Sequence, residues 1–85
     1  MSKFEKLKIK IKNGQSIFYE EAETCLLKLG FIVRSKGSHH VFAKDGYPKN
    51  ISIKKCPRLL SYQMNLIAEA IEFIEKKEAI EKNEE

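Results

Sequence analysis

Apolar residues recur at intervals of three and four between residues 19 and 29, which predicts an amphipathic helix. Its apolar face is formed by Ala22, Cys25, Leu26 and Leu29. Three glutamates stand in its first turns, where the helix dipole favours acidic side chains, and Gly30 is placed to end it. Phe18 precedes the helix in place of a capping Ser, Thr or Asp, so Ser16 is an alternative cap for an earlier start.

A second amphipathic helix is predicted over residues 62–78, with Ser61 as its N-cap. A continuous apolar face is formed by Met64, Ile67, Ala68, Ile71 and Ile74. Beyond residue 78 the only sizeable apolar side chain is that of Ile80. We therefore expect residues 79–85 to form a flexible acidic tail.

Residues 3–12 fit two kinds of element. Apolar residues alternate with lysines from Leu7 to Ile11, as in a strand, whereas Phe4, Leu7 and Ile11 have helical spacing. An Asn-Gly pair ends the element in either case. The periodicity therefore leaves helix and strand both open for this segment.

Three short strands are predicted between the two amphipathic helices, at about residues 31–36, 39–44 and 50–54. A Gly-Ser pair joins the first two, and the turn signal Asp-Gly-Tyr-Pro joins the second and third. Such short connections favour an antiparallel sheet.

Alternation along these strands assigns side chains to the two faces of the sheet. Phe42 is the largest apolar residue of the middle strand and is expected to face the core, so His40 points inward and His39 outward. The isoleucines of the third strand face inward, which turns Ser52 and Lys54 outward. We therefore expect His39, Ser52 and Lys54 to share the uncovered face, provided that no bulge interrupts the first hairpin.

The order helix, three antiparallel strands, helix predicts an α+β fold. Both helices need one apolar face of the sheet, which leaves the other face open. This is the outline of an α-β-β-β-α double-stranded-RNA-binding-like fold. The chain has 85 residues, enough for a single domain, and its core is expected over about residues 18–78.

Charge is distributed unevenly along the chain, whose net charge is +4. Residues 1–60 hold 13 basic and 5 acidic residues, a net of +8, and residues 61–85 hold 3 basic and 7 acidic residues, a net of −4. Residues 31–60 alone hold seven basic residues against one aspartate. A basic sheet suits nucleic acid or an acidic protein, but surface lysines also simply solvate a small sheet and protect its edges.

The sequence has no run of 18 or more apolar residues, and its first residues lack the apolar stretch of a secretory signal. We therefore expect a cytoplasmic protein with no membrane partner. Cys25 and Cys56 have no metal-ligand spacing and are expected to be free thiols, Cys25 in the core.

Two motifs, Leu29-Gly30-Phe31 and Lys36-Gly37-Ser38-His39-His40-Val41-Phe42, resemble the HicA family of toxins from bacterial toxin–antitoxin pairs. The similarity extends to Asn50-Ile51-Ser52-Ile53 and Tyr62-Gln63 and covers about residues 18–74. It implies the α-β-β-β-α fold, with an extra N-terminal helix that favours helix over residues 3–12. The chain departs from the family pattern at Ser61, where a proline often stands, and at Phe18, where a serine is usual.

The resemblance implies an mRNA interferase, which is an endoribonuclease that cleaves messenger RNA and is neutralised by a HicB-like antitoxin. The family's functional histidine falls on His39, and no cofactor is expected. The candidate RNA-binding residues around it are Arg34, Lys36, Gly37, Ser38, Lys54 and Lys55.

RNA is cleaved without a metal when its 2′-hydroxyl is deprotonated and attacks the adjacent phosphate, and a histidine suits that proton transfer. We therefore predict that His39 is the general base or acid and that the neighbouring cations hold the phosphate. No second proton-transfer residue stands out, which predicts a slow enzyme. A metal site is not expected, because His39 and His40 point to opposite faces of one strand.

Two other functions fit the same residues. One is a non-catalytic RNA-binding module that uses the basic open face, and the other is an interaction protein for an acidic partner. Tyr47 and Tyr62 are candidates for stacking on bases, although tyrosines in such places are more often partly buried turn or helix-start residues.

Overall fold

The computed structural model describes residues 2–83, and the side chains of residues 2–81. Its three helices are α1 (Lys3–Lys12), α2 (Tyr19–Lys28) and α3 (Ser61–Asn83). None of them is both long and apolar enough to cross a lipid bilayer.

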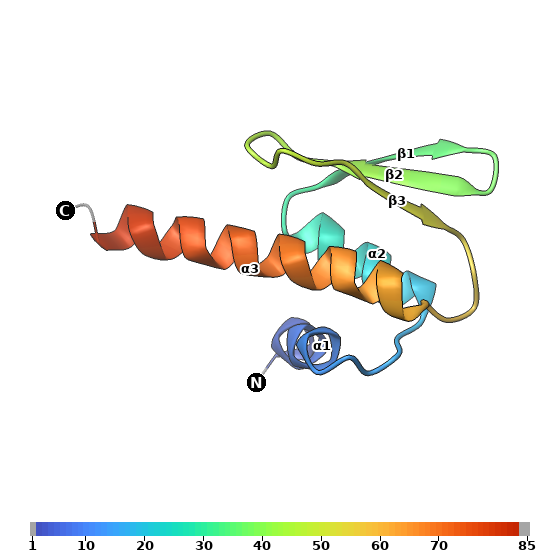
Figure 1. Cartoon of the computed structure of the whole chain (residues 1–85), viewed down its shortest axis with the longest axis horizontal. Helices are drawn as coiled ribbons and strands as arrows, with labels where there is room; N and C mark the ends of the chain where they lie inside the picture. Colours follow the sequence, from blue (N-terminus) through green and yellow to red (C-terminus); the bar gives the residue numbers. More distant parts are fainter. Residues whose placement is uncertain (1, 84–85) are drawn as a thin grey trace.

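The strands between α2 and α3 form one antiparallel sheet in the order β1-β2-β3. They are β1 (Ile32–Lys36), β2 (His39–Ala43) and β3 (Ile51–Lys54). Helices α2 and α3 lie under one face of this sheet, and α1 packs on the far side of the two helices (Figure 1). The predicted α+β class and the open antiparallel sheet are confirmed.

Residues 3–12, for which the periodicity left both helix and strand open, form the helix α1. Leu7 and Ile11 are buried, whereas Ile9 is 42% exposed, a pattern that alternation in a strand would not give. The Ser2 hydroxyl accepts a hydrogen bond from the Glu5 N–H at 3.2 Å and so caps the helix. The N-terminal helix implied by the resemblance is therefore present.

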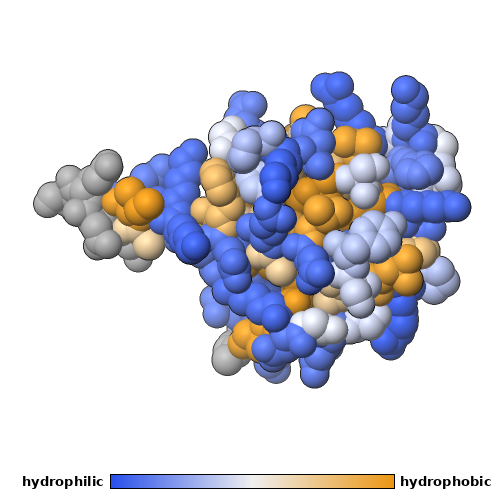
Figure 2. Space-filling view, in the orientation of Figure 1, coloured by the Kyte–Doolittle hydropathy of each residue, from blue (hydrophilic) through white to orange (hydrophobic). Residues whose placement is uncertain are grey.

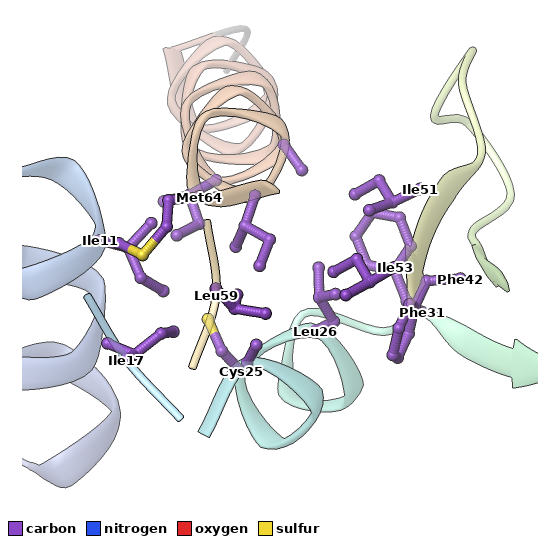
Figure 3. Close-up of a cluster of buried hydrophobic side chains, with 14 of the residues drawn as sticks. Ile11, Ile17, Cys25, Leu26, Phe31, Phe42, Ile51, Ile53, Leu59 and Met64 are labelled. Carbon is purple, nitrogen blue, oxygen red and sulfur yellow. The ribbon is translucent and has the colours of Figure 1, made fainter. Parts of the chain in front are cut away.

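One hydrophobic core joins the sheet to all three helices (Figure 3). Phe42, Ile51 and Ile53 project from the sheet and are at most 1% exposed. On the other side of the core, Ile11 of α1 lies beside Met64 of α3. Because the helices cover only one sheet face, the opposite face is left to solvent.

Helix α3 is longer than predicted. The expected end near residue 78 is wrong, because the helix continues to Asn83; residues 84 and 85 of the predicted tail lie outside the described residues. The amphipathic pattern fades there, but Lys, Glu and Ala favour helix and no Gly or Pro interrupts them. Toward its C-terminal end α3 extends beyond the sheet and the other helices (Figure 1), and the face of the molecule seen in Figure 2 is mainly hydrophilic.

The predicted N-caps also need correction. Ser61 is the first residue of α3, not its cap, and the preceding Leu60 N–H donates to the Gln63 side chain at 2.8 Å. Ser16 does not cap α2, since its hydroxyl donates to the Leu59 carbonyl at 3.3 Å. In both helices a Glu or Gln in the first turn accepts a hydrogen bond from the backbone N–H of the residue before the helix, which is one half of a capping box.

Candidate functional site

The register of the sheet brings His39 between two lysines. His39 pairs directly with Lys36 of β1 on one side and with Lys54 of β3 on the other. Residues directly opposite one another point to the same face, with Cβ atoms about 5 Å apart. All three side chains are exposed, so they form a row on the open face, which we call the His39 row.

A second row lies next to the His39 row on the same face. It consists of Arg34, Val41 and Ser52, which are paired across the three strands. The predicted sharing of one face by His39, Ser52 and Lys54 is confirmed by this register. Among the described residues, no carboxylate forms an ion pair with Arg34 or with either lysine of the His39 row, so these cations are available to a phosphate.

The turn between β1 and β2 fixes this register. Gly37 has φ +64°, and Ser38 does not have a positive φ, which is the pattern of a two-residue type II′ turn with glycine at its first central position. No bulge interrupts the pairing from Lys36↔His39 onward. The Lys55 N–H donates to the Ser38 carbonyl at 2.9 Å. The turn and the end of β3 therefore lie together beside His39.

His40 occupies the opposite face, as alternation predicts. It pairs with Ser35 and Ile53 and is half-buried. Its ring centroid lies 5.2 Å from that of Tyr19, at an interplanar angle of 52°. Its Nδ1 is buried and has no hydrogen-bond partner among the described atoms. His40 is thus a packing neighbour of helix α2, not part of the open face.

Strand β1 is less covered than the other strands. Each of its five residues is exposed, and even the inward-facing Val33 is 36% exposed. Helices α2 and α3 therefore shield β2 and β3 better than β1. The basic residues of β1, Arg34 and Lys36, stand at an accessible edge of the site.

Not every basic residue of the sheet region belongs to the site. Lys49 follows the β2–β3 turn and pairs with Glu69 of α3 at 2.6 Å. The Glu69 side chain, through its hydrogen bond and its charge, raises the pKa of Lys49. Lys49 therefore joins the sheet to α3 and is partly neutralised there.

The two cysteines are free, and they differ in surroundings. Cys25 is fully buried on α2, and burial raises the pKa of its thiol to about 11. Cys56 is half-buried, with its sulfur 3.1 Å from the Arg58 carbonyl oxygen. Within the described residues, no group of three or more His, Cys, Asp and Glu side chains is placed to hold a metal ion.

Sequence reasoning missed one feature at the starts of α2 and α3. The Arg58 guanidinium lies 4.6 Å from the centre of the exposed Phe18 ring, and the two residues form an isolated antiparallel bridge. They are 40 positions apart, so periodicity gave no signal of their contact.

Tyr62 is 61% exposed, whereas Tyr47 is half-buried in an aromatic cluster with Phe31 and Phe73. Of the two tyrosines considered for stacking, Tyr62 is thus the more exposed.

Comparison of the chain with protein-family models, with curated proteins and with solved structures gave no match.

Proposed function

We propose that this protein is a HicA-like toxin, an endoribonuclease that cleaves messenger RNA on the open face of its sheet. The observation that carries the proposal is the His39 row, in which an exposed imidazole stands between two ammonium groups. The resemblance of the Lys36–Phe42 motif to HicA toxins supports the same role for His39. The element order α2-β1-β2-β3-α3 supports a double-stranded-RNA-binding-like fold, to which α1 is added at the N-terminal side.

The row suits a metal-independent cleavage in which the RNA supplies its own nucleophile. His39 takes the proton from a 2′-hydroxyl, and the oxygen attacks the adjacent phosphorus. The bond from phosphorus to the 5′-oxygen breaks, which gives a 2′,3′-cyclic phosphate and a 5′-hydroxyl end. The leaving oxygen takes a proton from water or from the imidazolium. Lys36 and Lys54 stabilise the charge that develops on the phosphate.

A single acid–base residue sets the expected rate. General acid–base catalysis by one positioned side chain accelerates a reaction by about 10²- to 10⁴-fold. We therefore expect a slow enzyme whose activity falls by about that factor in His39→Ala. The partner of this toxin would be a HicB-like antitoxin, and a reading frame for one beside this gene would support the proposal.

The experiment is cleavage of a defined single-stranded RNA by purified native protein and by His39→Ala, in buffer with a chelator of divalent metals. Circular dichroism first establishes that both proteins are folded. We expect the native protein to cut and to leave 2′,3′-cyclic phosphate ends, and the variant to lose the activity. Lys10→Ala serves as the matched control, since Lys10 lies on α1, on the far side of the helices from the sheet.

A second substrate tests the nucleophile. Replacing the nucleotide at the cut site by its 2′-deoxy form removes the attacking hydroxyl, so cleavage there should stop. Continued cleavage of that substrate, or equal cleavage by native protein and His39→Ala, would show that the proposed mechanism is wrong.

One observation favours a second candidate, a non-catalytic RNA-binding module. Within the described residues, the open face offers no acidic side chain beside His39, since its neighbours there are basic, apolar or hydroxyl residues. Salt-dependent RNA binding by native protein without any cleavage would select this alternative.

A further inference from the structure

The starts of α2 and α3 lie side by side at the end of the molecule where the chain leaves β3 (Figure 1). Their approach is held by backbone hydrogen bonds. The Leu59 N–H donates to the Ile17 carbonyl at 3.0 Å, and the Tyr19 N–H donates to the Pro57 carbonyl at 3.4 Å. Phe18 and Arg58 face each other in this bridge.

The side chains of Phe18 and Arg58 form a stack on the surface. The guanidinium carbon of Arg58 lies 4.6 Å from the centroid of the Phe18 ring, which is 48% exposed. Arg58 is exposed too, and among the described residues no carboxylate pairs with it. The stack therefore combines an exposed aromatic ring with a free, planar positive charge.

The fold does not require an aromatic side chain at position 18. The backbone of Phe18 makes both the bridge and the cap, since its N–H donates to the Glu21 carboxylate at 2.9 Å. A phenyl ring has no acceptor with which to cap the helix itself. An apolar ring that stays about half exposed at a helix start leaves much of its surface free for a ligand.

Arg58 of the stack follows Lys54 of the His39 row closely along the chain. Lys54 of that row and Arg58 are four residues apart, which limits their Cα separation to about 14 Å. Lys55 lies between them and is bonded through its N–H to Ser38. Lys54, Lys55 and Arg58 are thus the basic residues of the chain segment that joins the His39 row to the stack, and we call these three residues the basic path.

We propose that the Phe18–Arg58 stack binds an unpaired base of single-stranded RNA whose backbone runs along this basic path to the His39 row. Aromatic rings and guanidinium planes both stack on splayed-out bases, and they do so largely without regard to base identity. The inference rests on RNA being the ligand of the proposed function, and it adds that the RNA is single-stranded where it passes the stack. It does not depend on catalysis by His39.

The test measures binding by fluorescence anisotropy, with a short labelled 2′-O-methyl RNA that cannot be cut through its 2′-oxygen. A second labelled oligomer has the same sugar–phosphate chain with abasic positions throughout. We expect Phe18→Ala to bind the base-bearing oligomer about 5- to 100-fold more weakly than the native protein does. It should bind the abasic oligomer as the native protein does, because the phosphate contacts are intact.

Two further variants separate stacking from general damage. Phe18→Trp keeps a stacking ring and should retain the native affinity. Leu60→Ala removes another exposed apolar side chain near the start of α3 and should leave both affinities unchanged. A loss in Phe18→Ala that is equal for both oligomers, or no loss for either, would overturn the proposal.

The outcome is separable from that of the proposed function. If the native protein binds base-bearing RNA through Phe18 but never cleaves it, the stacking site stands and the proposed nuclease activity is wrong. If the native protein cleaves RNA but Phe18→Ala does not weaken its binding to RNA, the nuclease activity stands and the stacking site is wrong.

Discussion

His39 and His40 are neighbours in sequence, but the pleat of β2 gives them different surroundings. The first faces solvent between two lysines, and the second faces α2 against Tyr19. Tyr19 is itself buried, and its hydroxyl donates to Glu23 at 3.0 Å. Burial and the Glu23 carboxylate raise the pKa of Tyr19, so its hydroxyl stays protonated and keeps this bond.

The two histidines should therefore respond differently to substitution. In His40→Leu we expect RNA cleavage to be unchanged, because this ring lies off the open face. The free energy of unfolding should stay the same or rise by up to about 1 kcal/mol, since the substitution removes a buried nitrogen without a partner. Cleavage assays and urea unfolding, with His39→Ala in parallel, check both statements. A loss of cleavage as large as that in His39→Ala would contradict the division of roles.

Alternation was sufficient to predict these orientations, because a strand with one buried face has little freedom of register. Phe42 is buried completely, so its neighbours two positions along must share its face. The contact between Phe18 and Arg58 was not predictable in the same way. It depends on how two loops meet in space, and neither loop has a period that encodes its partner.

The packing of α1 on α3 includes one group of charges. Glu75 of α3 accepts hydrogen bonds from Lys12 at 2.6 Å and from Lys8 at 3.2 Å, both on α1. The hydrogen bond from Lys12, with a contribution from Lys8, lowers the pKa of the Glu75 carboxyl. The charged form of Glu75 is thus favoured in the folded protein and tightens the contact between the two helices.

This coupling predicts a pH-dependent loss of stability in Glu75→Gln. Because the folded-state pKa is below the unfolded one, the stabilisation is complete above the unfolded pKa, which is about 4.3. It disappears as the pH falls through the folded pKa. The Glu75 side chain is 40% exposed, so solvent screening limits the expected loss at pH 7 to about 0.5 kcal/mol.

Thermal unfolding of the native protein and Glu75→Gln at pH 7 and pH 3 measures this difference. A loss of that size lowers the melting temperature by about 3 °C at pH 7, and the two proteins should converge at pH 3. Glu72→Gln is the control, since it removes the same charge from an exposed site on the same helix without an ion pair among the described residues. A constant difference at both pH values would show that the charge of Glu75 is not the cause.

Periodicity predicted the elements better than it predicted their ends. The two-residue turn and Gly30 gave clear signals, and the strands agree with the expected bounds to within one residue. Helix α3 continues past the point where its apolar pattern fades, because helix propensity alone carries it further. For α1 the sequence pattern was ambiguous, and burial of one face against α3 decided it.

Basic and acidic side chains are concentrated on different layers of the molecule. The open face carries Arg34, Lys36 and Lys54, whereas α3, beneath the sheet, holds most of the acidic residues of the C-terminal quarter of the chain. Glu69 and Glu75 of α3 are engaged with lysines of the same chain. A polyanion therefore meets the free cations on the open face and few carboxylates there.

This arrangement predicts how RNA binding depends on salt. Each phosphate contact on a single strand contributes a slope of about −0.7 to log K against log salt concentration. With contacts from Arg34, Lys36, Lys54 and Lys55, we expect a total slope of about −3. Lys54→Ala should reduce its magnitude by about 0.7 and weaken binding of all sequences alike.

Anisotropy titrations of the 2′-O-methyl RNA across a range of salt concentrations give both slopes. Lys10→Ala changes the net charge by the same amount at α1, so it should leave the slope as in the native protein. If Lys54→Ala and Lys10→Ala reduce the magnitude of the slope equally, the binding depends on net charge and not on the open face. A slope near zero in the native protein would leave the interaction with an acidic protein as the better account of the basic sheet, because phosphate contacts necessarily release counterions.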